Sequence, residues 1–215
     1  MIEKYELLPL FHTPLYITKV DIANKETQFI LNSEYEDMQD GARGQLSKNK
    51  YILDKRSLSL LKKQLDKHII VYTQTLLKVD PKIKFCLENS WIIKHDPKDY
   101  ARLHFHSNTF LSGVIYVQVP PNSGDIIFSD RRAHNSLLSP IVKIPYSELN
   151  IHNATQWSVK PEKNLLLIFP ASLQHWVSAN KTEESRYGIA FNYGIKGTMG
   201  SVITLDLAKY VGNTR

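Results

Sequence analysis

Two histidines stand two positions apart, at His104 and His106, in a segment that leads into a predicted strand. Because strand side chains alternate between the two faces, both imidazoles would point to the same side and could meet one metal ion. A neutral imidazole is a common ligand for iron, zinc, copper and nickel. On its own the pair is a weak signal, since surface or core histidines also occur at this spacing.

The third candidate ligand is His175, which follows the apolar run Leu165–Phe169 where the next predicted strand begins. A lone histidine at such a position is more often structural. Arg186, eleven residues later, strengthens the metal interpretation, because an arginine facing inward from an apolar strand needs an anionic partner to offset its desolvation. A dicarboxylate would supply that partner through a bidentate, charge-assisted contact. The alternative is a salt bridge from Arg186 to Glu183 or Glu184 in the preceding turn.

Strands must position these residues, and the pattern predicts them in the second half of the chain. Residues 1–20 are expected to form an extended segment with an edge strand, and a short helix is expected between Asn24 and Met38. Apolar residues recur at three- and four-residue steps over Ser57–Leu77, which predicts an amphipathic helix capped by Ser57. From residue 84 onward, segments rich in β-branched and aromatic residues predict strands at 90–94, 113–119, 125–128, 165–169 and 187–193.

Helices followed by strands predict an α+β chain whose catalytic part is an antiparallel barrel or sandwich. We expect one domain over residues 1–215, made of an N-terminal strand and supporting helices (1–83), a β core (84–196) and a C-terminal extension (197–215). The polar stretch 131–155 is predicted to be a long insertion loop, and loops of that length are often functional.

The composition, with 42% hydrophobic and 22% charged residues, is typical of an ordinary globular protein. The first ten residues lack the basic and apolar regions of a secretory signal, and no apolar run reaches the roughly 18 residues of a membrane span. The single cysteine, Cys86, fits a reducing compartment. We therefore expect a soluble cytoplasmic protein with no membrane partner. The net charge of +6 suits an acidic partner, but the lysines are scattered, so a solvated basic surface is the simpler explanation.

Several short motifs lie between residues 84 and 196, namely Asn89–Trp91, His104–His106, Leu111–Val117, Gly124–Arg131, Phe169–Pro170 and Arg186–Asn192. Together they resemble the 2-oxoglutarate and Fe(II) oxygenases of marine bacteria and phages, and more distantly the prolyl-hydroxylase superfamily. The resemblance implies a double-stranded β-helix, a jelly-roll or cupin-like barrel, with N-terminal supporting helices. It also implies Fe(II) as the metal and 2-oxoglutarate as the cosubstrate.

Carried over to this sequence, the resemblance implies that His104 is the first iron ligand and His175 the distal one. Arg186 would then bind the far carboxylate of 2-oxoglutarate. Tyr116 falls where the superfamily has a tyrosine that touches the same carboxylate. Asn192 would line the cosubstrate pocket.

His106 departs from the superfamily pattern, which usually has an aspartate or glutamate at this position. Three outcomes stay open: coordination by His104, His106 and His175, a two-histidine site with water in the vacancy, or a site that has lost iron chemistry. The other histidines have no partner at a ligand spacing and are interpreted as surface or packing residues. They are His12, His68, His95, His134 and His152.

The implied reaction uses O2, converts 2-oxoglutarate to succinate and CO2, and hydroxylates a C–H bond of a primary substrate. Peptides, nucleic acids and small molecules all stay open as that substrate, with specificity expected in the loops 94–103 and 131–155 and in the N-terminal helices. One alternative is a catalytically inactive cupin-like module that binds a metal or ligand, which the missing carboxylate at residue 106 favours. Another is a nucleic-acid demethylase, which the positive charge suggests. The edge-like N-terminal strand could serve a homodimer.

Overall fold

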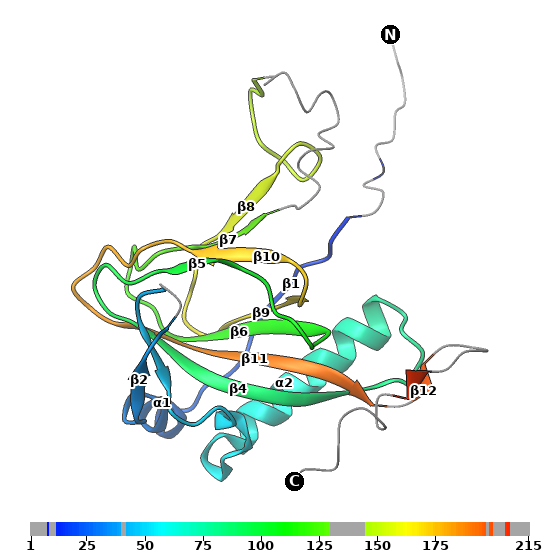
Figure 1. Ribbon diagram of the computed structural model, residues 1–215, viewed down its shortest axis with the longest axis horizontal. Helices are drawn as coiled ribbons and strands as arrows, with labels where there is room; N and C mark the ends of the chain where they lie inside the picture. The colour runs from blue at the N-terminus through cyan, green and yellow to red at the C-terminus, as the bar shows by residue number, and fades with distance from the viewer. Residues whose placement is uncertain are drawn as a thin grey trace.

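The computed structural model of the chain describes residue 8 and residues 12–39, 42–129, 145–196, 198–199 and 205–206. The main body of the molecule is a sandwich of two antiparallel sheets (Figure 1). The larger sheet has the strand order β1 (Tyr16–Lys19), β9 (Leu165–Pro170), β6 (Leu111–Gln118), β11 (Arg186–Lys196), β4 (Lys84–His95), β3 (Gln45–Ser47) and β2 (Tyr35–Asp37). The smaller sheet has the order β5 (Ala101–His104), β10 (Gln174–Val177), β7 (Ile126–Ser129) and β8 (Gln156–Val159). Two further strands, β12 (Thr198–Met199) and β13 (Leu205–Asp206), pair with each other.

Each of the five strands predicted from the sequence overlaps an observed strand, namely β4, β6, β7, β9 and β11. The largest difference is at β4, which already begins at Lys84. Strands β5 and β8 were not predicted, because they are four residues long and largely exposed, and therefore lack an apolar pattern. Of the predicted insertion loop, residues 131–144 lie outside the described residues, and residues 145–155 form turns and bends before β8.

The helices precede the β core in the chain. Helix α1 spans Asn24–Leu31 and is shorter than predicted, because the following residues Tyr35–Asp37 form β2. Helix α2 spans Ser59–Ile70 and continues as the π-helical segment η3, Val71–Leu76. The expected Ser57 cap is wrong. Two 3-10 turns, η1 (Ile52–Asp54) and η2 (Arg56–Leu58), run directly into α2, whose N-cap position is occupied by Leu58 without a side-chain cap.

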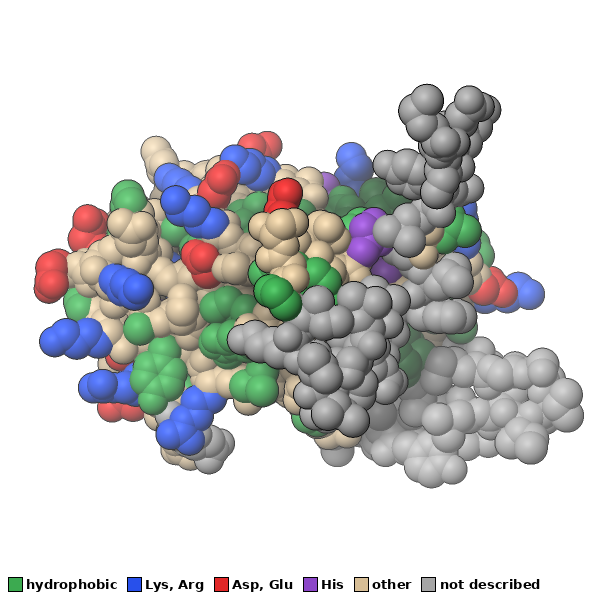
Figure 2. Space-filling model, turned by 90° about the horizontal axis from the view of Figure 1, so that it is seen from above, with side chains coloured by type: hydrophobic (Ala, Val, Ile, Leu, Met, Phe, Trp, Pro, Cys, Tyr) green, Lys and Arg blue, Asp and Glu red, His purple; other side chains and the backbone are tan. Residues whose placement is uncertain are grey.

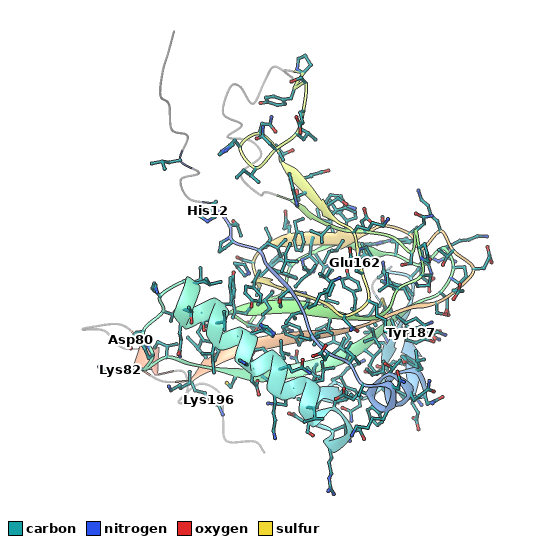
Figure 3. All side chains as sticks on the ribbon, turned by 180° about the vertical axis from the view of Figure 1, so that it is seen from behind. His12, Asp80, Lys82, Glu162, Tyr187 and Lys196 are labelled. Carbon is teal, nitrogen blue, oxygen red and sulfur yellow. The ribbon has the colours of Figure 1, made fainter. Side chains whose placement is uncertain are left out.

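Helix α2 covers one face of the larger sheet, as the view from behind shows (Figure 3). Its buried residues Leu61, Leu65 and Ile69 recur every four positions and so form one stripe. This stripe belongs to the same hydrophobic core as Ile115 and Ile189 of the sheet. Full burial of a leucine or isoleucine contributes about 1.5–3 kcal/mol, so this layer adds to the stability of the fold. Among the described residues, no helix has the length and apolar character needed to cross a membrane.

The other face of the larger sheet turns toward the smaller sheet, and the strand register decides which side chains it carries. Residues directly opposite each other in antiparallel strands share a face. Arg186 of β11 lies opposite His95 of β4, and Gly188 lies opposite Tyr116 of β6. Tyr187, between Arg186 and Gly188 in sequence, and Ile189, which follows them, pack on the helix side. Arg186, His95 and Tyr116 therefore all project into the space between the two sheets.

Candidate functional site

Three histidines meet at the edge of the space between the sheets. His104 at the end of β5 and His175 in β10 are directly opposite each other in the ladder. His106 follows β5, and its backbone N–H donates to the Ala171 carbonyl over 2.9 Å. One ring nitrogen from each of the three can be chosen so that all lie within 4.8 Å of one another. Among the described residues, this is the one group of three or more potential metal ligands, and it contains no carboxylate.

Backbone carbonyls fix the orientation of two of these imidazoles. Nδ1 of His104 lies 2.7 Å from the Arg102 carbonyl, and Nδ1 of His175 lies 2.9 Å from the Leu173 carbonyl. A carbonyl oxygen only accepts, so in each ring Nδ1 carries the proton and Nε2 keeps its lone pair. An outer hydrogen bond of this kind is the usual way in which a metal-binding histidine is held. The two Nε2 atoms are therefore prepared to bind a metal ion.

His106 sits differently from the other two. Its ring stacks on that of His175, with centroids 5.3 Å apart, and also lies beside Trp91. Burial and the nearby His104 lower the pKa of His106 to about 4, and the same two causes lower the pKa of His175 to about 3. Both rings are therefore neutral at pH 7, which is the form that binds metals.

A cavity of about 420 Å³ connects the histidines with the buried polar residues of the larger sheet. His104, His106 and His175 line it together with Tyr116 and Arg186. Most of its remaining wall is apolar, with Trp91, Ile93, Val114, Ile126, Phe169 and Val177. The cavity thus combines candidate metal ligands, a buried arginine and a largely apolar wall.

Arg186 is only 4% exposed, and among the described residues no carboxylate forms an ion pair with it. Its Nη1 donates to the carbonyls of Ser123 and Gly124 over 2.7 and 2.6 Å, and its Nη2 donates to Nδ1 of His95. No ion pair joins Arg186 to a carboxylate in the part of the chain that the structure describes, so the alternative of a salt bridge to Glu183 or Glu184 is wrong. A buried guanidinium held only by neutral acceptors keeps its charge available for an anion.

The turn that supplies the two carbonyls depends on Gly124. This residue has a φ of +93°, and a Cβ at this position would lie 2.2 Å from the Ser178 carbonyl oxygen. Only glycine fits such a close approach of two backbones. Gly124 therefore helps indirectly to position Arg186.

Tyr116 and Asn192, both predicted to contact the cosubstrate, have different surroundings. Tyr116 lines the cavity, and burial raises the pKa of its hydroxyl to about 12, so the hydroxyl stays a neutral donor. Asn192 is not among the lining residues of the cavity. Its amide oxygen accepts a hydrogen bond from the Ser112 hydroxyl over 2.7 Å, and its amide nitrogen donates one to Oδ1 of Asn89 over 2.9 Å. Six residues of strand separate it from Arg186, a distance of about 20 Å, so both cannot hold one carboxylate.

His95 is the residue that sequence analysis missed. It was interpreted as a surface or packing histidine, yet it lines the cavity and is 1% exposed. The sequence carries no local signal for it, because its partner Arg186 is 91 positions away and meets it only through the β4–β11 register. Of the other histidines, His68 bonds the Tyr16 hydroxyl over 2.9 Å, and His134 lies outside the described residues.

We expect His95 to make the folded protein sensitive to acid. Burial, followed by the charge of Arg186, lowers the pKa of His95 from 6.5 to about 3. The unfolded chain therefore takes up this proton first as pH falls. The stabilisation is fully present above pH 6.5 and is lost progressively toward pH 3, by about 1.4 kcal/mol per pH unit. Urea-unfolding free energies between pH 7 and 4 measure this slope. His95→Asn, which cannot titrate, should lack this contribution, and equal slopes for both proteins would contradict the assignment.

The sandwich of two antiparallel sheets, with a group of potential metal ligands in the cavity between them, is the fold of the solved 2-oxoglutarate and Fe(II) oxygenases. Residues 89–192 match the family model described as "Putative 2OG-Fe(II) oxygenase". The match spans 104 of the 215 residues and identifies the β core as that of a 2-oxoglutarate- and Fe(II)-dependent oxygenase. The family and the cofactors expected from the sequence motifs are thereby confirmed. No curated protein sequence matches the chain.

Solved structures with the same fold cover most of the chain. A prolyl-4-hydroxylase from Pseudomonas putida has a TM-score of 0.55 at 11% identity, covering 86% of this chain and 94% of that one. HygX from Streptomyces hygroscopicus, solved with nickel and 2-oxoglutarate bound, has a TM-score of 0.56 at 12% identity, covering 85% and 83%. The epimerase SnoN from nogalamycin biosynthesis has a TM-score of 0.56 at 15% identity, covering 85% and 78%. At these identities the likeness shows the fold alone.

Proposed function

We propose that this chain is a dioxygenase that hydroxylates a C–H bond of a second substrate while it converts 2-oxoglutarate and O2 to succinate and CO2. The observation that carries this proposal is one cavity lined by three converging imidazoles and by a buried arginine without a carboxylate partner. The imidazoles suit a first-row metal such as Fe(II), and the arginine suits the far carboxylate of a dicarboxylate.

In this proposal each residue of the cavity has a separate task. His104, His106 and His175 hold Fe(II), which supplies the site where O2 is activated. Arg186 and Tyr116 bind the far carboxylate of 2-oxoglutarate and so orient its keto-acid end toward the metal. The apolar wall excludes water, which strengthens these polar contacts. Three protein ligands leave the other coordination positions for the cosubstrate and O2.

The role of His106 decides between the proposal and its alternatives. Its place in the same group of ring nitrogens, and its neutral form at pH 7, support three-histidine ligation. The missing carboxylate instead supports a two-histidine site with water in the vacancy, or an inactive module that binds a metal or ligand. Three-histidine ligation, a two-histidine site and an inactive module would each respond differently to replacement of His106.

The test is an anaerobic titration of the protein with Fe(II) and 2-oxoglutarate, following the weak visible charge-transfer band of the bidentate complex. We expect the band in the wild type, a weaker band in His106→Ala, and a retained band in His106→Asp, because a carboxylate is also an iron ligand. A band of equal strength in wild type and His106→Ala would assign the metal to two histidines. A wild type that binds neither Fe(II) nor 2-oxoglutarate would overturn the proposed function.

The charges on the face shown in Figure 2 give no support for a nucleic-acid substrate. On the face shown in Figure 2, Lys and Arg side chains are interspersed with Asp and Glu and do not gather in one patch. Several lysines are paired with carboxylates, namely Lys19, Lys48, Lys50, Lys62 and Lys94. A demethylase acting on DNA or RNA would need a continuous basic surface for the phosphates.

Some finer expectations also stay proposals. Helices α1 and α2 are proposed to support the larger sheet. The division of the chain at residues 83 and 196, the cytoplasmic location and a homodimer through the N-terminal strand are predictions. Within the described residues, strand β1 forms the end of the larger sheet, where it pairs with β9 alone. An edge strand of this kind is a usual place for pairing with a second chain.

A further inference from the structure

We infer that His95 is a positioning residue for cosubstrate binding: it holds the Arg186 guanidinium in the cavity as a neutral hydrogen-bond acceptor, so that the remaining N–H groups of the arginine face the bound dicarboxylate. The inference rests on the proposed function, in which Arg186 binds the far carboxylate of 2-oxoglutarate. It adds a residue that the family pattern and the sequence did not point to.

The first observation is the position of His95 in the sheet. His95 ends β4 directly opposite Arg186, the first residue of β11, so the two side chains leave the sheet side by side on the face that lines the cavity. His95 is 1% exposed. A histidine buried this deeply needs a polar partner, and it has one in Arg186.

The second observation is the arrangement of hydrogen bonds around the guanidinium. An arginine has five N–H donors. Nη1 uses two of them on the carbonyls of Ser123 and Gly124, and Nη2 uses one on Nδ1 of His95. The remaining two N–H groups have no partner among the described residues. Two is the number that a carboxylate accepts in a bidentate contact.

The third observation is the chemical nature of the holding groups. All three are neutral acceptors, because arginine only donates and Nδ1 of His95 must therefore carry the lone pair. An aspartate or glutamate in place of His95 would also orient the arginine, but it would neutralise the charge that the ligand needs. A neutral histidine orients the guanidinium without competing with the dicarboxylate.

The backbone next to His95 limits where its ring can go. Gly44 has a φ of +140°, and a Cβ added to it would lie 2.6 Å from Cδ2 of His95. The backbone of Gly44 on one side and Arg186 on the other therefore confine the imidazole. Nε2 of His95 is buried without a hydrogen-bond partner among the described residues, so the hydrogen bond to Arg186 through Nδ1 is the one that sets the ring orientation.

The experiment compares two ligands and two variants of the full chain, loaded with Fe(II) without oxygen, by titration calorimetry. The ligands are 2-oxoglutarate and 2-oxovalerate, in which a methyl group replaces the far carboxylate. His95→Leu removes the acceptor, whereas His95→Asn keeps an amide oxygen close to the position of Nδ1. We expect His95→Leu to weaken 2-oxoglutarate binding about tenfold or more and to leave 2-oxovalerate binding unchanged. His95→Asn should recover most of the lost affinity.

Other results would overturn the inference. If His95→Leu bound 2-oxoglutarate as tightly as the wild type, His95 would not position Arg186 for the cosubstrate. Equal weakening of both ligands, or equal losses in His95→Leu and His95→Asn, would show that His95 only packs. Circular dichroism checks the fold, and His95→Phe, also without an acceptor, replaces His95→Leu if the latter does not fold. A wild type that binds no 2-oxoglutarate would instead overturn the proposed function, so the two failures are distinguishable.

Discussion

His175→Ala is expected to abolish metal-dependent succinate formation and to weaken Fe(II) binding by more than about 100-fold. Loss of an outer hydrogen bond to a ligand already costs 10- to 100-fold in metal affinity, so loss of a proposed ligand should cost more. His175 is the best placed of the three histidines to show this effect. It is 4% exposed, its Nδ1 proton is held by the Leu173 carbonyl, and its ring contacts that of His104 with centroids 4.3 Å apart.

The measurement is Fe(II) affinity under anaerobic conditions, followed by succinate formation from 2-oxoglutarate in air. His152→Ala is the matched control, because His152 lies in the turn before β8 and outside the group of potential ligands. Circular dichroism should show that the fold of His175→Ala is kept. Its ring packs between Phe128 and Phe169, which can close part of the space left by the smaller side chain. If His175→Ala kept the wild-type metal affinity and activity, His175 would not be a metal ligand.

The sequence predicted the β core well because its strands are long and apolar. In β6 and β9, almost every residue is buried, so β-branched and aromatic side chains accumulate in one run. Strand β5 has no such pattern. It has only four residues, and Arg102 and Leu103 are exposed, so it is a strand only because β10 pairs with it. Pairing between distant segments is a tertiary effect that local periodicity does not contain.

The metal ligands could be proposed from spacing and chemistry, whereas the surroundings of Arg186 could not. His104 and His106 are close in sequence, but His106 follows the strand, and the hydrogen bond from its backbone N–H to Ala171 places it. His95 was interpreted as a surface or packing residue because it has no partner at a ligand spacing in the sequence. Asn192 was proposed as part of the motif Arg186–Asn192 that carries the family resemblance, but a place on the same strand face does not mean a shared site. Six residues of strand carry it away from Arg186 along the sheet.

Arg186→Met is expected to raise the 2-oxoglutarate concentration needed for half-maximal activity by about 100-fold or more, with Fe(II) affinity unchanged. Charge-assisted hydrogen bonds contribute about 1.5–3 kcal/mol each, and a bidentate contact in an apolar cavity makes two of them. Methionine keeps most of the side-chain volume but has no donor. The effect should fall mainly on cosubstrate binding, because Arg186 is not among the potential metal ligands.

Two further variants test whether the effect of Arg186→Met comes from the paired N–H donors of its guanidinium. Arg102→Met changes another arginine that lines the same cavity but is exposed, so it should alter the 2-oxoglutarate requirement by less than about threefold. Arg186→Lys keeps a positive charge but cannot reach the Ser123 and Gly124 carbonyls and the dicarboxylate together, so we expect an intermediate loss. Equal effects of Arg186→Met and Arg102→Met on the 2-oxoglutarate requirement would mean that the cavity attracts the cosubstrate through its total charge. Arg186 would then have no specific contact with the cosubstrate, and His95 would have no role in positioning it.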